Sequence, residues 1–400
     1  MGKKIFGQDT AILVAMGANL LSWFVRTFVP SLLPVLVPRL PQEQTEGPVT
    51  DSNNTKCVVI ARPGGVEQLR VITLKPGYCT TGYNVSPREG AFARIKDLPN
   101  DCVIVRIDSF SVNYADICIR WGLYESANQY VGYPIVPGFD IAGIVEHVGT
   151  DVRQFRVGDR VFGCTLFGAY SSRVMVPALH LRLIPSGWST SQASAIPTVA
   201  LTSLYSLFLA GHFPTPSKFS NTGILIHSAA GGVGSMLIQM SKLLGLSPVV
   251  GVVGRSAKVE EAKRLGCDVV IDKSATRNMW NEIAAASPSG YAAVMDSSGV
   301  DTLQQSYDHL AMTGRLIVYG FHTNLPMGRD MLSPWQWLKM AYKMTNMPKL
   351  DPMEMGAVNK AVLAFNLSFF ANEREMLSDL FDQVLAWLEE GKLSCPRSEK

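Results

Sequence analysis

One segment of the chain, residues 224–245, limits the fold more strongly than any other. It reads ILIHSAAGGVGSMLIQMSKLLG, an apolar run followed by a glycine turn and an amphipathic helical pattern. A buried strand, a glycine turn and a helix in this order form the phosphate-binding unit of a doubly wound parallel sheet. The glycines permit a close approach of the backbone to a pyrophosphate, which the free N–H groups at the helix start then face. The predicted cofactor contacts in this turn are Ala230, Gly231, Gly232, Val233 and Gly234.

The end of the next predicted strand indicates which dinucleotide would bind. An enzyme that uses NADH usually has an acidic residue about 20 residues past the glycines, where it bonds the ribose 2′-hydroxyl. This chain reads VVGRSAK there, with Gly254 in the place of the acid. Arg255, Ser256 and Lys258 offer positive charge and a hydroxyl to a 2′-phosphate, so the sequence favours NADPH. The alternative is that Arg255 and Lys258 only solvate the start of the following helix.

Strand and helix patterns divide the chain into two globular domains. A chain of 400 residues with 47% hydrophobic residues can bury two cores. Residues 56–190 contain short β-like runs separated by Gly and Pro, which predict a β-rich front domain. Residues 191–375 alternate helices with apolar strands, which predicts a Rossmann-type doubly wound parallel sheet and an α/β fold. The expected strands lie at 223–228, 249–253, 269–272, 292–296 and 315–319, and the expected helices at 232–244 and 257–265.

Charge and cysteine spacing argue against three classes of protein. The net charge is +3 with no basic block, so no nucleic-acid partner is expected. The seven cysteines include no C-x-x-C pair, and no His cluster has metal-ligand spacing, which argues against a zinc ribbon and a disulfide scaffold. An odd number of scattered cysteines suits a reducing compartment.

The N-terminal residues 1–40 form an apolar leader that begins with Lys3 and Lys4. The run from 11 to 38 is close to the length that spans a bilayer, although Arg26 and three prolines interrupt it. Three interpretations stay open: a signal anchor or membrane-associated helix, a cleaved signal or transit segment, and a loosely packed leader. We therefore expect membrane association or organelle targeting, with a cytoplasmic location as the alternative. A polar linker is expected at residues 41–55.

Several motifs are similar to those of a known family. The predicted front domain contains, in this order, VNYADICIRWGLYES, PGFDIAGIVEHVG and GDRV. The predicted Rossmann-type domain contains AAGGVG, VMDSSG and GRLIVYGF. These motifs resemble the medium-chain dehydrogenase/reductase superfamily, in its zinc-free quinone oxidoreductase branch and nearest to the vesicle amine transport protein group. The resemblance runs from about Cys57 to Leu393 and implies a GroES-like front domain before the Rossmann-type domain.

The resemblance also implies roles for individual residues. Asn113 would line the nicotinamide and substrate cleft, and Tyr124 would hydrogen-bond the substrate or supply a proton, with packing in the cleft wall as the alternative. Asp116 is expected to fix the local turn rather than take part in chemistry. Lys273 stands where many relatives have an aromatic residue. Further contacts with the cofactor are implied for Thr202, Ser298, Gly320 and Phe321.

The positions that hold catalytic zinc in related alcohol dehydrogenases have other residues in this chain. Asn113 stands in the place of the cysteine, and Gly138, Phe139 and Asp140 stand in the place of Gly-His-Glu. The lobe of closely spaced cysteines is also missing, so the resemblance implies no zinc site. Without a Lewis acid the substrate must already be electrophilic, which fits a quinone or an α,β-unsaturated carbonyl compound.

Two other functions stay open beside this reductase. A membrane-associated NADPH-binding interaction protein with little or no catalysis would account for the apolar leader. The hypothesis that the chain reduces an enoyl thioester rests on Tyr124 alone.

The C-terminal part of the chain leads to two further expectations. The family continues after a segment like GKLSCP with a return to the front domain, so residues 376–400 are expected to begin that return and to be cut short. The apolar run at 361–370 suits a strand at a sheet edge, which would pair across a two-fold axis in a homodimer.

Overall fold

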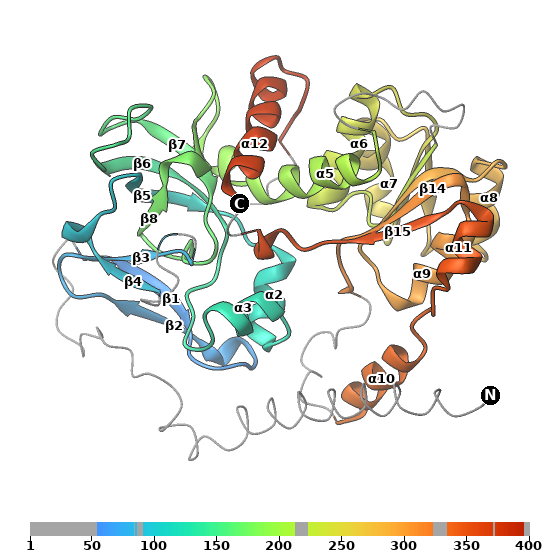
Figure 1. Cartoon of the computed structure of the whole chain (residues 1–400), viewed down its shortest axis with the longest axis horizontal. Coiled ribbons are helices and arrows are strands. Elements are labelled where there is room, and N and C mark those ends of the chain that lie inside the picture. Colours follow the sequence, from blue (N-terminus) through green and yellow to red (C-terminus); the bar gives the residue numbers. More distant parts are fainter. Residues whose placement is uncertain are drawn as a thin grey trace. The chain divides into compact units, whose positions relative to one another are not determined.

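The computed structural model describes residues 54–83, 85, 91–212, 223–322, 334–370 and 373–395. The chain forms two compact units, and each is described by itself below (Figure 1). Unit 1 extends to Ser194 and includes the short segment Ala371–Arg374, and unit 2 begins at Ala195 and continues after that segment with Glu375. The apolar leader and nearly all of the predicted linker lie outside the described residues.

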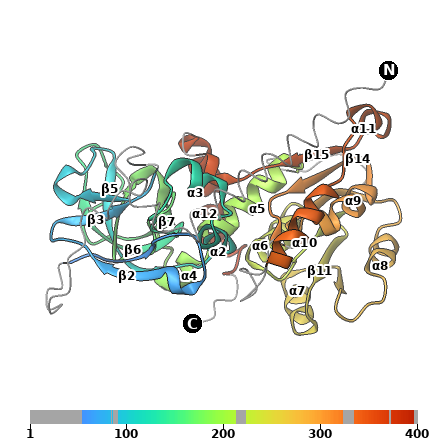
Figure 2. The same ribbon diagram turned by 90° about the horizontal axis from the view of Figure 1, so that it is seen from below.

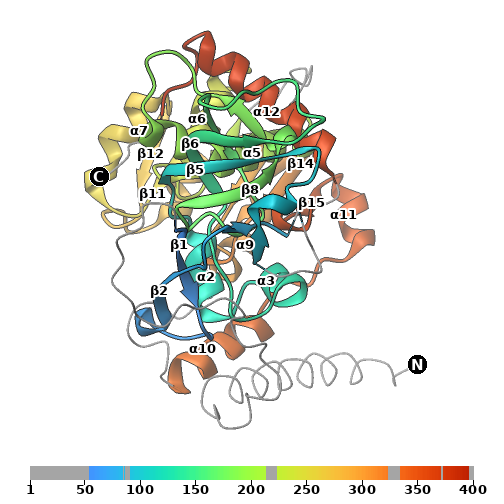
Figure 3. The same ribbon diagram turned by 90° about the vertical axis from the view of Figure 1, so that its left-hand side faces the viewer.

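In the described part of the chain, unit 1 is built on a seven-stranded sheet with the order β4-β3-β8-β5-β6-β7-β9. Neighbouring strands are antiparallel except β3 and β8, which confirms the predicted β-rich front domain. Figure 3 shows β5, β6 and β8 of this sheet. The strands are β1 (Lys56–Ile60) and β2 (Leu69–Thr73), which form a separate pair, and β3 (Tyr78–Thr81), β4 (Phe92–Arg94), β5 (Cys102–Phe110), β6 (Asp140–Val148), β7 (Arg160–Cys164), β8 (Arg173–Pro177) and β9 (Leu181–Leu183). The α-helices are α2 (Tyr114–Trp121), α3 (Glu125–Tyr130) and α4 (Thr190–Ser194).

Apolar side chains of the central strands form the core of unit 1. Val103 and Val105 on β5 and Ile141 on β6 are fully buried in one cluster. The strands β5 and β6 approach closely, because a Cβ atom at Gly143 would lie 1.9 Å from the carbonyl oxygen of Arg106. Only glycine fits such a contact. The end of β5 and the start of β6 therefore lie side by side where the chain leads into α2.

Unit 2 contains a six-stranded parallel sheet in its described part, with the order β12-β11-β10-β13-β14-β15. From β10 the sheet extends in one direction through β11 and β12, and in the other direction through β13, β14 and β15. This order confirms the predicted doubly wound sheet. All five residues of β11 are buried, as expected where helices cover both faces of a parallel sheet. The strands are β10 (Ile224–Ile226), β11 (Val249–Val253), β12 (Val269–Asp272), β13 (Tyr291–Asp296), β14 (Leu310–Val318) and β15 (Ala361–Ala364).

Helices alternate with the strands of unit 2 and pack around the sheet (Figure 2). Their apolar sides meet buried strand residues such as Leu225, Val250 and Val294, which belong to one core cluster. The α-helices are α5 (Pro197–Leu209), α6 (Gly232–Leu243), α7 (Val259–Leu265), α8 (Met279–Ala286), α9 (Val300–Asp308), α10 (Pro334–Thr345), α11 (Pro352–Val358) and α12 (Arg374–Glu389). Short 3-10 turns lie at Val66–Gln68, Ile95–Asp97 and Ala178–His180 in unit 1 and at Ser256–Lys258 and Leu367–Phe369 in unit 2.

The C-terminal helix α12 packs with unit 2 from Glu375 onward. Its residues Phe381 and Val384 are buried almost completely. Beyond the helix, the backbone N–H and the hydroxyl of Ser394 both donate to Oε1 of Gln239 on α6, each at 2.8 Å. This packing differs from the expected domain boundary, which assigned residues 376–400 to a return toward the front domain. The apolar side of α12 is the reason, because it completes the cover of unit 2.

Candidate functional site

The strand order of unit 2 changes direction between β10 and β13. In open parallel sheets, ligands bind outside the carboxyl ends of the strands at such a switch point. The structure places nearly all of the predicted cofactor residues at this edge. Ala230, Gly231, Gly232, Val233 and Gly234 follow β10, Gly254, Arg255, Ser256 and Lys258 follow β11, Ser298 follows β13, and Gly320 and Phe321 follow β14.

Thr202 lies on α5, which packs against the start of α6. The hydroxyl of its neighbour Ser203 donates to the carbonyl oxygen of Val233 at 2.9 Å. A Cβ atom at Gly232 would lie 2.8 Å from Cγ1 of Val199. The middle of α5 therefore adjoins the glycine turn, as expected for a residue near the cofactor.

The glycine turn has the shape that a pyrophosphate needs. Gly231 is the N-cap of α6 with extended backbone, and no side chain caps the helix there. A Cβ atom at Gly234 would lie 2.4 Å from the carbonyl oxygen of Ser228 and 2.5 Å from that of Ala229, so a side chain is excluded. The N–H groups of a helix start, with its positive dipole end, attract an anion. The turn therefore fits the phosphates of a dinucleotide.

The turn after β11 adds positive charge beside the glycine turn. Arg255 and Ser256 are exposed. The Nζ atom of Lys258 donates to the carbonyl oxygen of Ala230 at 3.5 Å, which links the two turns. The hydroxyl of Ser256 donates to Oδ2 of Asp272 at 2.5 Å. Sequence reasoning missed Asp272, because this acid ends the third strand of the unit, β12, and does not follow the second, β11.

A buried polar cluster holds the strand ends at the switch point. The carboxylate of Asp296, at the end of β13, accepts hydrogen bonds from the hydroxyls of Thr302 and Ser306 at 2.8 Å each and from the N–H of Ser298 at 2.7 Å. The Nε2 atom of His227, just after β10, lies 3.0 Å from the Ser306 hydroxyl. Burial lowers the pKa of His227, so its ring is neutral at pH 7. The cluster joins β10 to β13 through α9, and sequence reasoning did not identify it.

The predicted substrate residue Asn113 lies in unit 1, in the segment between β5 and α2. Its side-chain nitrogen donates to Oδ2 of Asp140 at 2.7 Å and to the hydroxyl of Ser111 at 3.0 Å. Ser111 also donates a short hydrogen bond to the same oxygen of Asp140. Asp140 is 1% exposed, so these donors compensate for the burial of its carboxylate. The amide of Asn113 is therefore held in one orientation within its own unit.

Asp116 organises the turn that carries Asn113. Its carboxylate accepts hydrogen bonds from the N–H groups of Asn113 at 2.8 Å and Gly138 at 3.0 Å and from the hydroxyl of Tyr170 at 3.0 Å. Burial raises the pKa of Asp116 to about 7, and the nearby charge of Asp140 adds to this effect. This arrangement agrees with the expectation that Asp116 fixes the local turn.

Tyr124 is the N-cap residue of α3 and is partly buried. Its ring packs edge-on against that of Phe139, with 6.1 Å between the centroids. Tyr124 and Asn113 both belong to unit 1, whereas the predicted cofactor residues all belong to unit 2. Their roles toward a substrate stay predictions.

The side chains of the described residues form no group of three or more His, Cys, Asp or Glu that could hold a metal ion. Burial raises the pKa of Cys57 and of Cys118 to about 12, so both are neutral thiols at pH 7. These two cysteines pack as small apolar residues.

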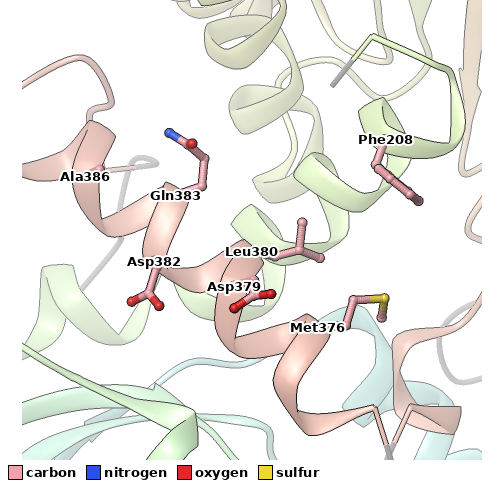
Figure 4. Close-up of a pocket in the computed structure, with 7 residues that line it drawn as sticks. All are labelled: Phe208, Met376, Asp379, Leu380, Asp382, Gln383 and Ala386. Carbon is pink, nitrogen blue, oxygen red and sulfur yellow. The ribbon is translucent and has the colours of Figure 1, made fainter. Parts of the chain in front are cut away.

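One surface groove lies within unit 2, between α5 and α12 (Figure 4). Phe208 of α5 and residues of α12 line it, and none of the predicted site residues does. The carboxylates of Asp379 and Asp382 both come from α12. The lining residues are Phe208, Met376, Asp379, Leu380, Asp382, Gln383 and Ala386.

A single helical stretch among the described residues, Thr190–Leu209, is long and apolar enough to cross a membrane. Within it, 61% of the most apolar window is buried inside the protein, as is common for core helices. The leader segment 11–38, on which the expected membrane association depends, lies outside the described residues.

Comparisons with known proteins agree with this architecture. Residues 99–186 match the family described as alcohol dehydrogenase GroES-like domain, which confirms the predicted front domain. Residues 232–342 match the family described as zinc-binding dehydrogenase. Among solved structures, the quinone oxidoreductase of Pseudomonas syringae pv. Tomato superposes with a TM-score of 0.64 at 27% identity, covering 85% of this chain and 90% of that chain.

Similar sequences lead to the same group of proteins. The synaptic vesicle membrane protein VAT-1 homolog of Danio rerio is 30% identical over 291 residues, which cover 73% of this chain and 57% of the relative. The Homo sapiens protein of that name is 29% identical, covering 72% of this chain and 70% of the relative. The 2-haloacrylate reductase of Burkholderia sp is 34% identical over 224 residues, covering 54% and 64% respectively. The two matched domains and these relatives make the chain similar to the medium-chain dehydrogenase/reductase superfamily, in the quinone oxidoreductase branch and near the VAT-1 homologues.

Proposed function

We propose that the chain is an NADPH-dependent reductase that transfers a hydride to a quinone or an α,β-unsaturated carbonyl compound without zinc. One observation carries the proposal: the uncapped start of α6 and the basic turn after β11 lie side by side at the switch point of the sheet. This is the place and the charge that a phosphorylated dinucleotide requires.

The preference for NADPH is supported by the residues that follow β11. Gly254 leaves no acid there to bond a ribose 2′-hydroxyl, and Arg255 and Lys258 supply positive charge. A hydrogen bond to a charged group contributes about 1.5–3 kcal/mol, so two such contacts would discriminate strongly against NADH. The quinone oxidoreductase of Escherichia coli has a similar fold, with a TM-score of 0.65 and 23% identity to this chain, and its structure has been solved in complex with NADPH.

The reaction would need little acid or base chemistry from the protein. Bound NADPH would supply the hydride, and a conjugated acceptor needs orientation and a hydrogen-bond donor for its developing oxyanion, which then takes a proton from water. The Asp140 carboxylate holds the amide of Asn113 in a fixed orientation, which suits a residue that positions a polar group. Independence from zinc is supported by Asn113 and Phe139, which stand where zinc-dependent relatives have ligands.

The proposal is tested by turnover of the purified full chain. NADPH oxidation is followed at 340 nm with a set of quinones, enones and, as a third class, enoyl thioesters. We expect turnover with at least one quinone or enone that persists in excess EDTA. Saturable NADPH binding without turnover of any acceptor would rule out the reductase, and turnover of thioesters alone would assign a different substrate class.

A second candidate function is a membrane-associated NADPH-binding interaction protein. It is supported by the apolar run at residues 11–38 and by the name of the VAT-1 homologues, which are called synaptic vesicle membrane proteins. Deleting residues 1–40 should then release the protein from vesicles while its affinity for NADPH is unchanged. If the protein that lacks residues 1–40 binds vesicles as well as the full chain does, the leader is not the membrane contact.

A homodimer is a further part of the proposal. The strand β15 lies at one edge of the sheet of unit 2 and pairs with β14 on its other side. An edge strand offers free backbone groups to a second copy. Light scattering of the intact chain should give twice the monomer mass, and Leu363→Pro on β15 should shift it to the monomer. A mass of one chain for the wild type would contradict this assembly.

A further inference from the structure

The end of β12 places two oppositely charged residues, Asp272 and Lys273, next to the basic turn after β11. The two strands are neighbours, and the N–H of Lys273 donates to the carbonyl oxygen of Val253 at 3.0 Å. Neither Asp272 nor Lys273 belongs to the residues that sequence motifs assign to the cofactor. Their position makes them candidates to influence it.

The side chain of Lys273 reaches over the place where NADH-dependent proteins have their acid. Its Cε atom lies 3.4 Å from the position of a Cβ atom at Gly254. Beside burial, the charge of Lys273 contributes to the lowered pKa values of His227, which follows β10, and His322, which follows β14. The Lys273 charge therefore acts at the carboxyl edge of the sheet.

Asp272 acts on the same turn with the opposite charge. Its Oδ2 atom accepts the hydroxyl of Ser256 at 2.5 Å, and its Oδ1 atom accepts the N–H of Ser274 at 2.9 Å. These hydrogen bonds, from Ser256 first, lower the pKa of Asp272, so it is ionised at pH 7. The Ser256 hydroxyl is thus bound to a carboxylate and is not turned toward an anion.

The basic side chains of this region are not neutralised by the protein. In the described part of the chain, none of Arg255, Lys258 and Lys273 forms an ion pair with a carboxylate. In the turn after β11 and at the end of β12, the three cations face the carboxylate of Asp272, which leaves a net positive charge in these two segments. Neighbouring like charges repel each other unless an anion binds between them.

We propose that Lys273 and Asp272 determine, in opposite directions, how strongly the site prefers NADPH over NADH. Lys273 contributes a third cation to the 2′-phosphate. Asp272 weakens the preference, because its charge repels the phosphate and it holds the Ser256 hydroxyl. The inference rests on the proposed dinucleotide site and assigns the balance of charge within it.

The test is a set of binding titrations with NADPH and NADH on the full chain, without any substrate. The variants are Lys273→Met, Asp272→Asn and the double variant. Lys392→Met and Asp308→Asn are matched controls, because Lys392 follows α12 and pairs with Glu390, and Asp308 ends α9. Lys273→Arg keeps the charge and should retain the wild-type ratio of dissociation constants.

Lys273→Met should weaken NADPH binding about tenfold and change NADH binding less than about twofold. Asp272→Asn should strengthen NADPH binding severalfold, and the double variant should return close to the wild-type ratio. The effect of Lys273→Met should shrink as salt is raised, because the contact is exposed. The controls should leave both affinities unchanged.

Equal losses for NADPH and NADH in Lys273→Met, or an unchanged ratio in both single variants, would overturn the inference. A wild-type chain that binds neither nucleotide would instead contradict the proposed function itself. Circular dichroism and the melting temperature show whether each variant is folded. If Lys273→Met does not fold, Asp272→Asn still tests the inference, because an unchanged ratio in that variant then overturns it.

Discussion

Replacing Gly234 by alanine perturbs the candidate cofactor site by a single methyl group. The new Cβ atom would lie 2.4 Å from the carbonyl oxygen of Ser228, 2.5 Å from that of Ala229 and 2.7 Å from the carbonyl carbon of Ala229. All three are backbone atoms, so the clash cannot be relieved by a side-chain rotation. Either the start of α6 or the turn after β10 must move.

Overpacking of this kind costs about 1–3 kcal/mol. The contact is with rigid backbone at the joint between strand and helix, so we expect the upper part of that range for the free energy of unfolding. The movement also displaces the N–H groups at the start of α6. The affinity for NADPH should therefore fall by more than about tenfold, because the anion contacts depend on their geometry.

Gly356→Ala is the matched control for this variant. Gly356 lies inside α11, and a Cβ atom there would meet nothing within 4 Å. The same change should stabilise the protein slightly, by about 0.4–1 kcal/mol, because alanine favours a helix. Urea unfolding and NADPH titration of both variants measure the two effects. If Gly234→Ala unfolds within about 0.5 kcal/mol of the wild type and keeps its affinity, the packing of the glycine turn is misjudged.

Three further predictions concern the two units. Asp116→Asn should remove a fall in stability between pH 4 and pH 7: burial raises the pKa of Asp116 from 3.8 to about 7, so the folded state holds this proton more tightly than the unfolded chain. Urea titrations of both proteins across that range test this prediction. The same pH dependence of stability in the variant and in the wild type would contradict it. Tyr124→Phe should lower kcat for an acceptor at least tenfold if the hydroxyl donates a proton, and leave it unchanged if the ring only packs on Phe139. Phe381→Ala should destabilise unit 2 by about 3–5 kcal/mol, because this ring is 1% exposed, and a smaller loss in thermal unfolding would indicate that α12 is not part of the core.

The strands and helices of unit 2 could be predicted closely from local patterns. The expected strands at 249–253 and 269–272 agree with β11 and β12, and the expected helix at 232–244 is one residue longer than α6. These elements have apolar runs or amphipathic periods that are bounded by Gly and Pro, so neighbouring residues determine them. The domain of α12 could not be predicted in this way, because an amphipathic helix shows which side it buries but not against which unit.

The candidate site could be predicted only as far as its motifs extend. The glycine turn follows a strand directly, so its place was clear from the sequence. Asp272 was missed, because its contact with Ser256 depends on the neighbouring positions of β11 and β12 in the sheet. The hydrogen bond between His227 and Ser306 likewise joins residues 79 positions apart, through α9. Such contacts depend on strand order, which local patterns do not contain.

Titration of the purified full chain with NADPH and NADH tests the central claim most directly. The uncapped start of α6 and the basic turn after β11 predict saturable binding of one NADPH per chain, with a dissociation constant at least about tenfold below that for NADH. The Gly234→Ala variant should lose this binding. Absence of saturable NADPH binding by the folded wild-type chain, or equal affinity for both nucleotides, would contradict the account.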